Sequence, residues 1–315
     1  MIQYHSKQGG EVVELDDMQP GCWINIVPPF SQEELEELSQ HFDMPLDFLT
    51  DPLDIDERSR YEREDDVRLI VVNTPVLNEM ENGVESLYIT VPIGIILTPE
   101  HLITITAFEN PVLQLFLDGK IRYFDPADEQ LFVLQILEHN VYRFLTCLKK
   151  LNLKRNTIEK ELLDSSRNSE LLQLLSIEKS LTYFINSLNA NELLKMKMKR
   201  SDFLHIRDDE DKTDLFEDII IDNSQALEMA NVYTNILNGT MDAYGSIISN
   251  NLNLTIRRLT LITIILMVPT LLASFYGMNV PLPLMDKSYT IILIIILSVL
   301  LSLGVTWYFR HKRMF

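Results

Sequence analysis

Cysteine is nearly absent from this sequence of 315 residues, which contains only Cys22 and Cys147. The two lie far apart in the chain, and neither belongs to a Cys-x-x-Cys pair or to a metal-ligand spacing. This arrangement excludes a disulfide framework and a thiolate metal site. We therefore expect two ordinary, partly buried thiols whose role is packing.

The sequence also lacks the short motifs that carry catalysis in many enzymes. Its six histidines form no His-Glu-x-x-His pair, and it has no P-loop, no Gly-x-Gly-x-x-Gly and no Gly-x-Ser-x-Gly. Such motifs position metal ions, phosphates or nucleophiles. We therefore expect neither an enzyme nor an organic cofactor.

Basic residues are few: the sequence has 27 Lys and Arg but 46 Asp and Glu, which gives a net charge of −19. Residues 250–315 contain six basic residues and one acidic residue, so this segment carries +5 and the preceding 249 residues carry −24. Nucleic acid binds clustered Lys and Arg, which an acidic body does not offer. We expect no nucleic-acid partner.

The basic C-terminal segment has two long uncharged runs, at 259–275 and 290–309. At 1.5 Å per residue they span about 25 and 30 Å, close to the hydrocarbon thickness of a bilayer. They predict transmembrane helices at about 259–276 and 289–309, which makes membrane lipid a partner.

The charges beside these spans predict their orientation. Arg257 and Arg258 precede the first span, and Arg310, Lys312 and Arg313 follow the second, whereas the connecting loop carries only Asp286 and Lys287. Positively charged flanks stay on the cytoplasmic side. We expect a multi-pass protein of the cell (inner) membrane, with both termini in the cytoplasm and the short loop outside.

The first 249 residues show no apolar leader, and we expect them in the cytoplasm. Residues 1–126 read as an α/β domain around one sheet, because β-branched runs bounded by turn residues alternate with helical patterns. The predicted strands lie at 67–77, 86–97 and 101–108. The predicted helix at 31–42 opens on Ser31 and Glu34, the spacing of a capping box.

Long helices are predicted for residues 127–256, the stalk region. The stretch 127–200 contains neither Pro nor Gly and has apolar residues at helical spacing, which indicates two antiparallel helices with a break near Asn168. An acidic turn is expected at 208–214. From about Leu215 one helix of roughly 60 residues would run into the first span, about 90 Å in all. Such a helix favours a symmetric bundle of identical copies.

One face of the first span is smaller and more polar than the other. The residues of this stripe are spaced three or four positions apart along the chain: Asn253, Ile256, Thr260, Thr263, Met267, Thr270 and Ser274. Close helix packing explains small hydroxyl residues in a membrane. The alternative is a pore lining in which the hydroxyls contact water and Met267 narrows the path. Pro269 would bend the helix there, with Thr hydroxyls satisfying the freed carbonyls.

Acidic residues and arginines alternate from 51 to 66. The simpler interpretation is a solvated surface whose charges pair with one another. The alternative is a weak divalent-cation site, because hard cations prefer carboxylate oxygens.

Gly277, Met278 and Asn279 follow the first span directly. A Gly-Met-Asn tripeptide after the penultimate transmembrane helix, with a short outer loop and a basic C-terminus, resembles the CorA family of magnesium transporters. The resemblance covers the whole architecture, including the acidic segment 51–66. It implies a funnel-shaped homopentamer: an α/β cytoplasmic domain, a long helical stalk and two C-terminal transmembrane helices, the hairpin at 257–315.

The resemblance also implies roles for individual residues. Gly277, Met278 and Asn279 would form a selectivity filter at the outer mouth of a pore lined by the first span. Leu259 and Met267 match hydrophobic constrictions, Asn253 matches a polar ring below them, and Thr270 matches a pore-facing hydroxyl. Thr263 and Ser274 share this face. Asp218 aligns with a carboxylate that senses intracellular Mg²⁺.

Two departures from the family pattern concern the pore and the outer loop. Many relatives have glycine where this chain has Ser274. The loop at 280–286 lacks the Met-Pro-Glu-Leu sequence that is common in the family.

These features predict a prokaryotic channel that imports Mg²⁺, with Co²⁺ as a second ion, under feedback from intracellular Mg²⁺. One alternative keeps the fold and changes the ion to Zn²⁺, Ni²⁺ or Co²⁺. Another is a non-conducting, membrane-anchored sensor.

Overall fold

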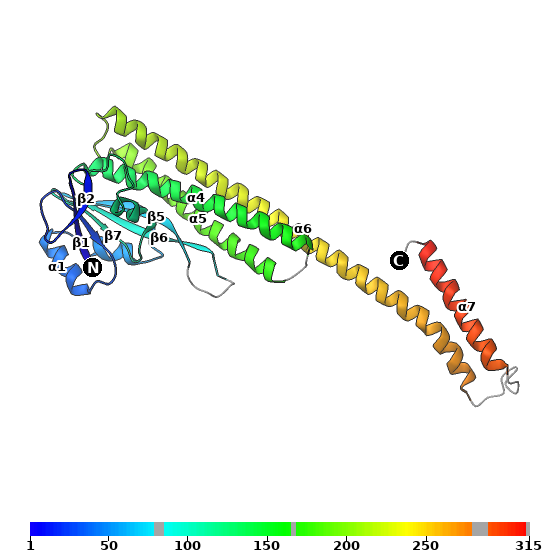
Figure 1. The fold of residues 1–315 in the computed structure, drawn as a ribbon. Coiled ribbons are helices and arrows are strands. Elements are labelled where there is room, and N and C mark those ends of the chain that lie inside the picture. Colours follow the sequence, from blue (N-terminus) through cyan, green and yellow to red (C-terminus); the bar gives the residue numbers. More distant parts are fainter. Residues whose placement is uncertain (79–84, 165–167, 279–288, 313–315) are drawn as a thin grey trace. The chain divides into compact units, whose positions relative to one another are not determined.

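The computed structural model describes residues 1–78, 85–164, 168–278 and 289–312 (Figure 1). The chain divides into two compact units, Met1–Met241 and Asp242–Phe315.

The first unit contains one sheet, as the sequence predicts, and this sheet has seven strands. Its spatial order is β2-β1-β3-β7-β6-β5-β4, and every pairing is antiparallel except the parallel pair β3–β7. The strands are β1 (Ile2–Gln8), β2 (Glu11–Leu15), β3 (Trp23–Ile26), β4 (Arg60–Glu64), β5 (Val67–Leu77), β6 (Tyr88–Leu97) and β7 (Leu102–Ile105).

Three of these strands were predicted and four were not. β5 has the predicted bounds, β6 begins two residues later than predicted, and β7 is shorter. The missed hairpin β1–β2 turns at Gly9 and Gly10, which both have positive φ. Paired glycines between two alternating segments are a hairpin signal, so this turn was readable from the sequence.

The helices are α1 (Gln32–His41), α2 (Asp47–Thr50), the 3₁₀ turn η1 (Asp51–Leu53), α3 (Pro111–Leu117), α4 (Glu129–Asp164), α5 (Asn168–Ser201), α6 (Glu210–Tyr276) and α7 (Thr290–His311). The capping box of Ser31 and Glu34 is present at α1. α4 and α5 confirm the predicted pair of long helices, and the gap between them lies at the predicted break.

Helices cover both faces of the sheet, and alternate residues of each strand supply the two cores. Ile70 and Val72 of β5 belong to a core with Trp23, α3 and α4, whereas Leu69 and Val71 belong to one with α1 and α2. Side chains of successive strand residues point to opposite faces, so a strand covered on both sides is apolar throughout. This explains why β5 and β6 are continuous hydrophobic runs.

The prediction of an acidic turn at 208–214 is wrong in part, because α6 already begins at Glu210. Asp209 caps it: its Oδ1 accepts a hydrogen bond from the amide of Lys212 at 3.1 Å. Carboxylates at a helix N-terminus bind free amide groups and interact favourably with the helix dipole. The acidic run therefore starts the long helix, which continues through Pro269 to Tyr276 over 67 residues.

The acidic segment 51–66 pairs with itself, as the simpler interpretation predicts. The Arg60 guanidinium contacts Asp51 at 2.7 Å, Glu62 at 2.5 Å, and Glu57. These charges lie at the edge strand β4 and the preceding turn. Both cysteines are free and fully buried, more deeply than expected, and burial raises the pKa of each thiol.

A buried lysine connects α5 to α6 within the first unit. Lys195 is fully buried, and its Nζ donates a hydrogen bond to Asn223 Oδ1 at 2.7 Å. Burial lowers the pKa of Lys195 to about 7, partly offset by Glu192. This contact holds the first part of α6 against α5.

Candidate functional site

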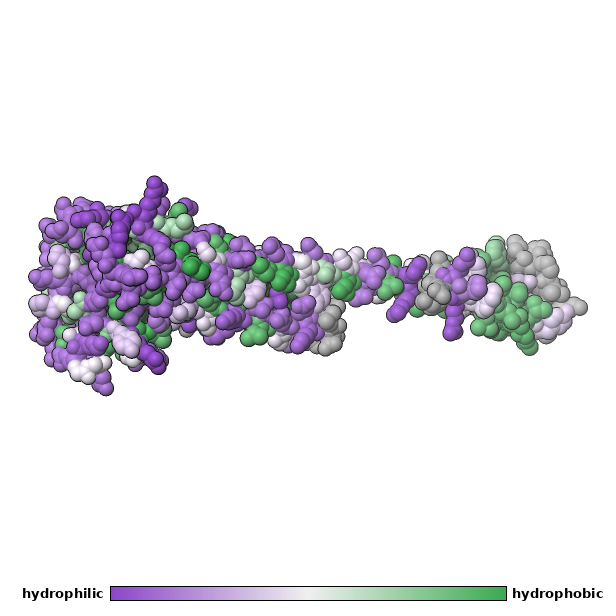
Figure 2. Space-filling view, turned by 90° about the horizontal axis from the view of Figure 1, so that it is seen from above, coloured by the Kyte–Doolittle hydropathy of each residue, from purple (hydrophilic) through white to green (hydrophobic). Residues whose placement is uncertain are grey.

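The second unit contains the end of α6 and the whole of α7, and it supplies the predicted pore residues. Both helices are long and apolar enough to cross a membrane, and the apolar windows of α6 and α7 are only 6% and 11% buried. Hydrophobic side chains gather over these helices (Figure 2). A core helix of a soluble protein would be mostly buried, so this exposure favours two membrane spans.

α7 covers one face of the first span. Within the first span, the residues of α6 that are buried or partly buried lie along one face at helical spacing: Leu261, Ile265, Val268, Pro269, Leu272 and Tyr276. Ser302 Oγ of α7 lies 3.4 Å from the Ile265 carbonyl oxygen, which places α7 on this face.

The predicted pore stripe lies on the opposite face and is exposed. Leu259, Thr263, Met267, Thr270 and Ser274 each lie two residues before a member of the covered set. Two residues correspond to about 200° around a helix, so the stripe faces away from α7. Leu259 and Met267 are 64% and 61% exposed, and Asn253 is exposed as well. The fold therefore leaves the predicted pore face free for contact with something other than its own hairpin.

The backbone carbonyl that loses its hydrogen-bond donor because of Pro269 finds a different donor from the predicted one. Proline has no amide hydrogen, so the Ile265 carbonyl one turn earlier loses its helical donor. The Ser302 hydroxyl of α7 donates to this carbonyl, whereas the threonines of α6 do not reach it. The sequence could not indicate this, because the donor lies on another helix.

The threonines of the stripe donate their protons into their own helix. Thr263 Oγ1 donates to the Leu259 carbonyl at 2.9 Å, and Thr270 Oγ1 lies 2.8 Å from the Met267 carbonyl. A hydroxyl has one proton and two acceptor lone pairs. With the proton committed, each oxygen presents acceptor lone pairs, which suit a cation or the water bound to it.

Gly277 ends α6 in a tight but unstrained backbone. Its amide donates to the Ala273 carbonyl at 3.0 Å, and a Cβ added here would lie 3.3 Å from that same oxygen. Its φ is not in the left-handed region. A methyl group at this position would therefore have to displace the Ala273 oxygen by a few tenths of an ångström. Met278 is exposed, whereas Asn279 and the loop at 280–286 lie outside the described residues.

The predicted sensor residue Asp218 is exposed on the first part of α6, in the first unit. Burial raises the pKa of Tyr142, and so do the negative charges of Glu138, Asp222 and Asp218. The described residues contain no group of three His, Cys, Asp or Glu that could hold a metal ion within one chain.

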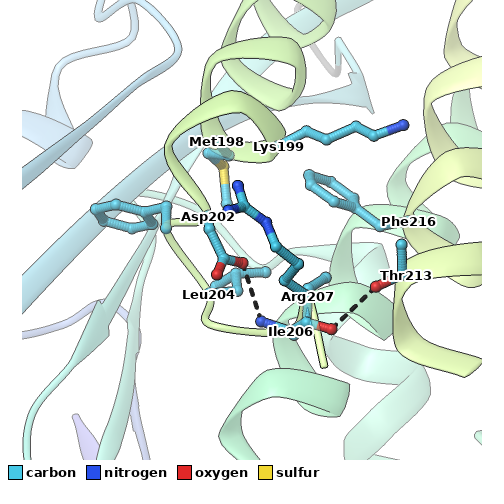
Figure 3. A pocket seen from close by; sticks show the side chains of 9 residues that line it. Met198, Lys199, Asp202, Leu204, Ile206, Arg207, Thr213 and Phe216 are labelled. Carbon is cyan, nitrogen blue, oxygen red and sulfur yellow. Dashed lines mark hydrogen bonds between the residues drawn. The ribbon is translucent and has the colours of Figure 1, made fainter. Parts of the chain in front are cut away.

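A separate cavity of about 190 Å³ lies where α5 turns into α6, and sequence reasoning did not predict it (Figure 3). Met198, Leu204 and Phe216 give it an apolar wall. Two polar residues of its lining bond to the turn itself: Asp202 Oδ1 accepts from the Ile206 amide, and Thr213 Oγ1 donates to the Ile206 carbonyl. These two polar groups therefore stabilise the turn, and Lys199, which also lines the cavity, pairs with Glu217.

Comparison with known proteins connects this geometry to one family. The family described as CorA-like Mg²⁺ transporter protein matches residues 19–312. A cobalt/magnesium transport protein CorA of Methanocaldococcus jannaschii is 27% identical over 295 residues, which are 92% of this chain and 90% of that protein.

Solved structures show the same fold. The complete CorA magnesium transporter of M. jannaschii superposes with a TM-score of 0.79 at 24% identity, over 98% of this chain and 97% of that one. The full-length CmaX protein gives a TM-score of 0.67 at 15% identity, with 98% of each chain covered.

Proposed function

This chain belongs to the family of CorA-like Mg²⁺ transporter proteins, and on that premise we propose that it is a channel that imports Mg²⁺, and also Co²⁺, through a pore lined by α6. The observation that carries the proposal is the exposed stripe on α6, which faces away from α7. A single hairpin cannot enclose a pore. The lining therefore forms between identical copies, and the family resemblance supports a homopentamer.

Membrane energetics favour this arrangement over exposure of the stripe to lipid. Polar groups on a membrane helix turn toward other helices or toward water, because lipid offers no hydrogen-bond partners. In the assembly Thr263, Thr270 and Ser274 line the pore with acceptor oxygens. Leu259 and Met267 form apolar constrictions, with Asn253 below them.

The outer mouth is formed by Gly277, Met278 and Asn279. Mg²⁺ releases its water reluctantly, so a selective mouth binds the hydrated ion through hydrogen bonds. Neutral amide oxygens of Asn279 accept bonds from metal-bound water without the deep electrostatic trap that a ring of carboxylates would create. The membrane potential drives entry, at about 4.6 kcal/mol for a divalent ion per 100 mV.

Intracellular Mg²⁺ regulates the channel through Asp218. Each chain carries −24 over its first 249 residues, which raises the local cation concentration. Mg²⁺ bound between Asp218 of one copy and carboxylates of its neighbour holds the ring closed. When intracellular Mg²⁺ falls, like charges repel and the pore opens. The protein lies in the inner membrane with both termini in the cytoplasm, as the flanking Arg and Lys favour.

The test is Mg²⁺ influx into liposomes that contain a Mg²⁺-sensitive dye and the purified full-length chain. Wild type should give an influx that increases with inside-negative potential, and Asn279→Ala should abolish it. Thr270→Val should reduce the influx about tenfold or less, since it removes one acceptor ring and keeps the side-chain shape.

The matched control for Thr270→Val is Thr306→Val. Thr306 of α7 also bonds to its own helix, with Oγ1 2.7 Å from the Ser302 carbonyl, but it lies off the stripe. The control should conduct like wild type. Equal loss in both variants would remove the stripe from the mechanism.

Other outcomes distinguish the alternatives. Influx of Zn²⁺ or Ni²⁺ without Mg²⁺ would change the ion and keep the pore. Absence of flux for all divalent ions in wild type would favour a membrane-anchored sensor.

A further inference from the structure

Positive charge is concentrated at the end of the hairpin opposite Gly277. Five cationic or titratable side chains from both helices form this basic end: Arg257, Arg258, Arg310, His311 and Lys312. The first two belong to α6, and the others end α7 or follow it directly.

The helix register places these side chains at one level. α6 and α7 run in opposite directions in the hairpin (Figure 1), and Ser302 meets Ile265 between them. Arg257 lies eight residues before Ile265, and Arg310 lies eight residues after Ser302. Both are therefore about 12 Å along the helices from that contact, and about 16 Å from the middle of the first span. This is the boundary of a hydrocarbon core about 30 Å thick.

The described residues around these cations hold no acidic side chain. Residues 243–278 and 289–312 contain no Asp or Glu, and Asp242 lies fifteen residues before Arg257 on α6. None of the ion pairs found in the described part of the chain includes Arg257, Arg258, Arg310 or Lys312. Unpaired guanidinium groups at the edge of a low-dielectric region attract anions strongly.

The surface next to the basic end is apolar and aromatic. Trp307 is 68% exposed and stacks on the ring of His311, with centroids 5.6 Å apart and planes 12° from parallel. Ile262 and Leu303 are exposed one to two turns closer to the middle of the spans. Cations above an apolar wall, with an aromatic ring at the boundary, match a phospholipid with an anionic headgroup.

We infer that the basic end of the hairpin is a binding site for anionic phospholipid, with the headgroup phosphate at Arg257 and Arg310 and the acyl chains along the apolar faces of α6 and α7. A free phosphate would use only the cations, whereas a lipid also covers the exposed apolar side chains beside them. The inference requires only that the hairpin spans a membrane, so it holds or fails independently of ion conduction.

Trp307 provides a local reporter, because the chain has only two tryptophans and the other, Trp23, is fully buried in the first unit. The full-length chain is reconstituted in phosphatidylcholine vesicles of symmetric composition. One series receives phosphatidylglycerol brominated near the glycerol, and the other receives phosphatidylcholine brominated at the same positions. Bromine quenches tryptophan on contact, and a Trp307→Phe variant gives the baseline from Trp23.

The anionic lipid should quench Trp307 at about thirtyfold lower mole fraction than the zwitterionic lipid, the ratio that two engaged cations supply. Arg257→Gln combined with Arg310→Gln should lower this ratio below about twofold. The matched control, Arg257→Lys with Arg310→Lys, keeps the charges and should keep most of the selectivity. An unchanged Trp307 emission maximum shows that the hairpin is still inserted.

Three results would overturn the inference. The first is equal quenching by the two brominated lipids in wild type. The second is selectivity that survives removal of both guanidinium groups. The third is loss of selectivity on adding inorganic phosphate at constant ionic strength, which would assign the site to a free anion.

Discussion

The two tryptophans of this chain show that its two units differ in how far they bury apolar side chains. Trp23 of the first unit is fully buried: it meets Phe116, Phe124 and Phe132 edge-on, and its indole donates to Thr104 Oγ1 at 2.8 Å. Trp307 of the second unit is 68% exposed. The first unit buries its hydrophobic residues against itself, whereas the second leaves them exposed. Water drives apolar side chains into a core, whereas a bilayer is as apolar as the side chains themselves and exerts no such force.

The largest effect should come from removing the buried tryptophan. Trp23→Ala leaves a cavity among three phenylalanines, and it should lower the free energy of unfolding of the first unit by about 3–5 kcal/mol. Thermal unfolding of the detergent-solubilised full chain, followed by circular dichroism, measures the change. Trp307→Ala is the control and should leave this transition in place. Equal shifts for the two variants would contradict the contrast between the units.

The two units should also differ in how they tolerate a single methyl group. A Cβ at Gly94 of β6 would lie 2.5 Å from Pro52 Cγ and 2.7 Å from Ile105 Cγ2. Gly94→Ala should therefore destabilise the first unit by about 1–3 kcal/mol. At Gly304 of α7 nothing lies within 4 Å, so Gly304→Ala should be tolerated. The same melting experiment tests both, and an unaffected Gly94→Ala protein would contradict the close packing of η1 on the sheet.

The buried Lys195 makes the stability of the first unit depend on pH. Its native pKa of about 7 lies below the ordinary value of 10.5. Between these values the unfolded chain binds a proton that the native chain does not, so stability rises with pH, by up to about 1.4 kcal/mol per unit. Below about pH 7 both states bind the proton, and this dependence ends.

Lys195→Met should remove this slope. Unfolding of the full chain, measured from pH 7 to 9 for both proteins, isolates the contribution, because other groups titrate alike in each. The control is Lys197→Met, at an exposed position of the same helix. Parallel stability curves for wild type and Lys195→Met would show that the lysine stays charged when buried.

The smallest effect should come from the contact between α6 and α7. Ser302→Ala removes the donor to the Ile265 carbonyl and should cost about 0.6 kcal/mol of hairpin stability. In a Pro269→Ala background the helix supplies its own amide donor, so the same substitution should cost almost nothing. A double-mutant cycle on detergent stability measures the difference. Additive effects would mean that the hydroxyl does not compensate for the proline.

Much of this architecture was readable from local patterns. Ser31 and Glu34 predicted the start of α1, the uninterrupted helical spacing predicted α4 and α5, and the apolar run at 67–77 predicted β5. The strands β1 and β2 were missed although their Gly-Gly turn was readable, whereas β3 has only four residues and β4 is highly charged. The edge strand β4 is five residues long and has the sequence Arg-Tyr-Glu-Arg-Glu.

The candidate site divides in the same way. Periodicity along α6 collected Thr263, Met267 and Thr270 on one face, because a helix repeats every 3.6 residues whatever surrounds it. In contrast, the packing of α7 against α6 was needed to show that Arg257 and Arg310 lie at the same height along the hairpin. It was also needed to identify the donor to the Ile265 carbonyl. These relations join residues that are far apart in sequence, and no local pattern encodes them.

The sequence by itself determined the spans, the acidic body, the helical periods and the Gly-Met-Asn signature, because hydropathy, charge and backbone preference are local properties. Only the tertiary structure decided which face of α6 is covered, how Gly94 meets Pro52, and that Lys195 is buried against Asn223. Those outcomes depend on which distant surfaces meet, and that choice is made by packing and by the need to satisfy every buried polar group.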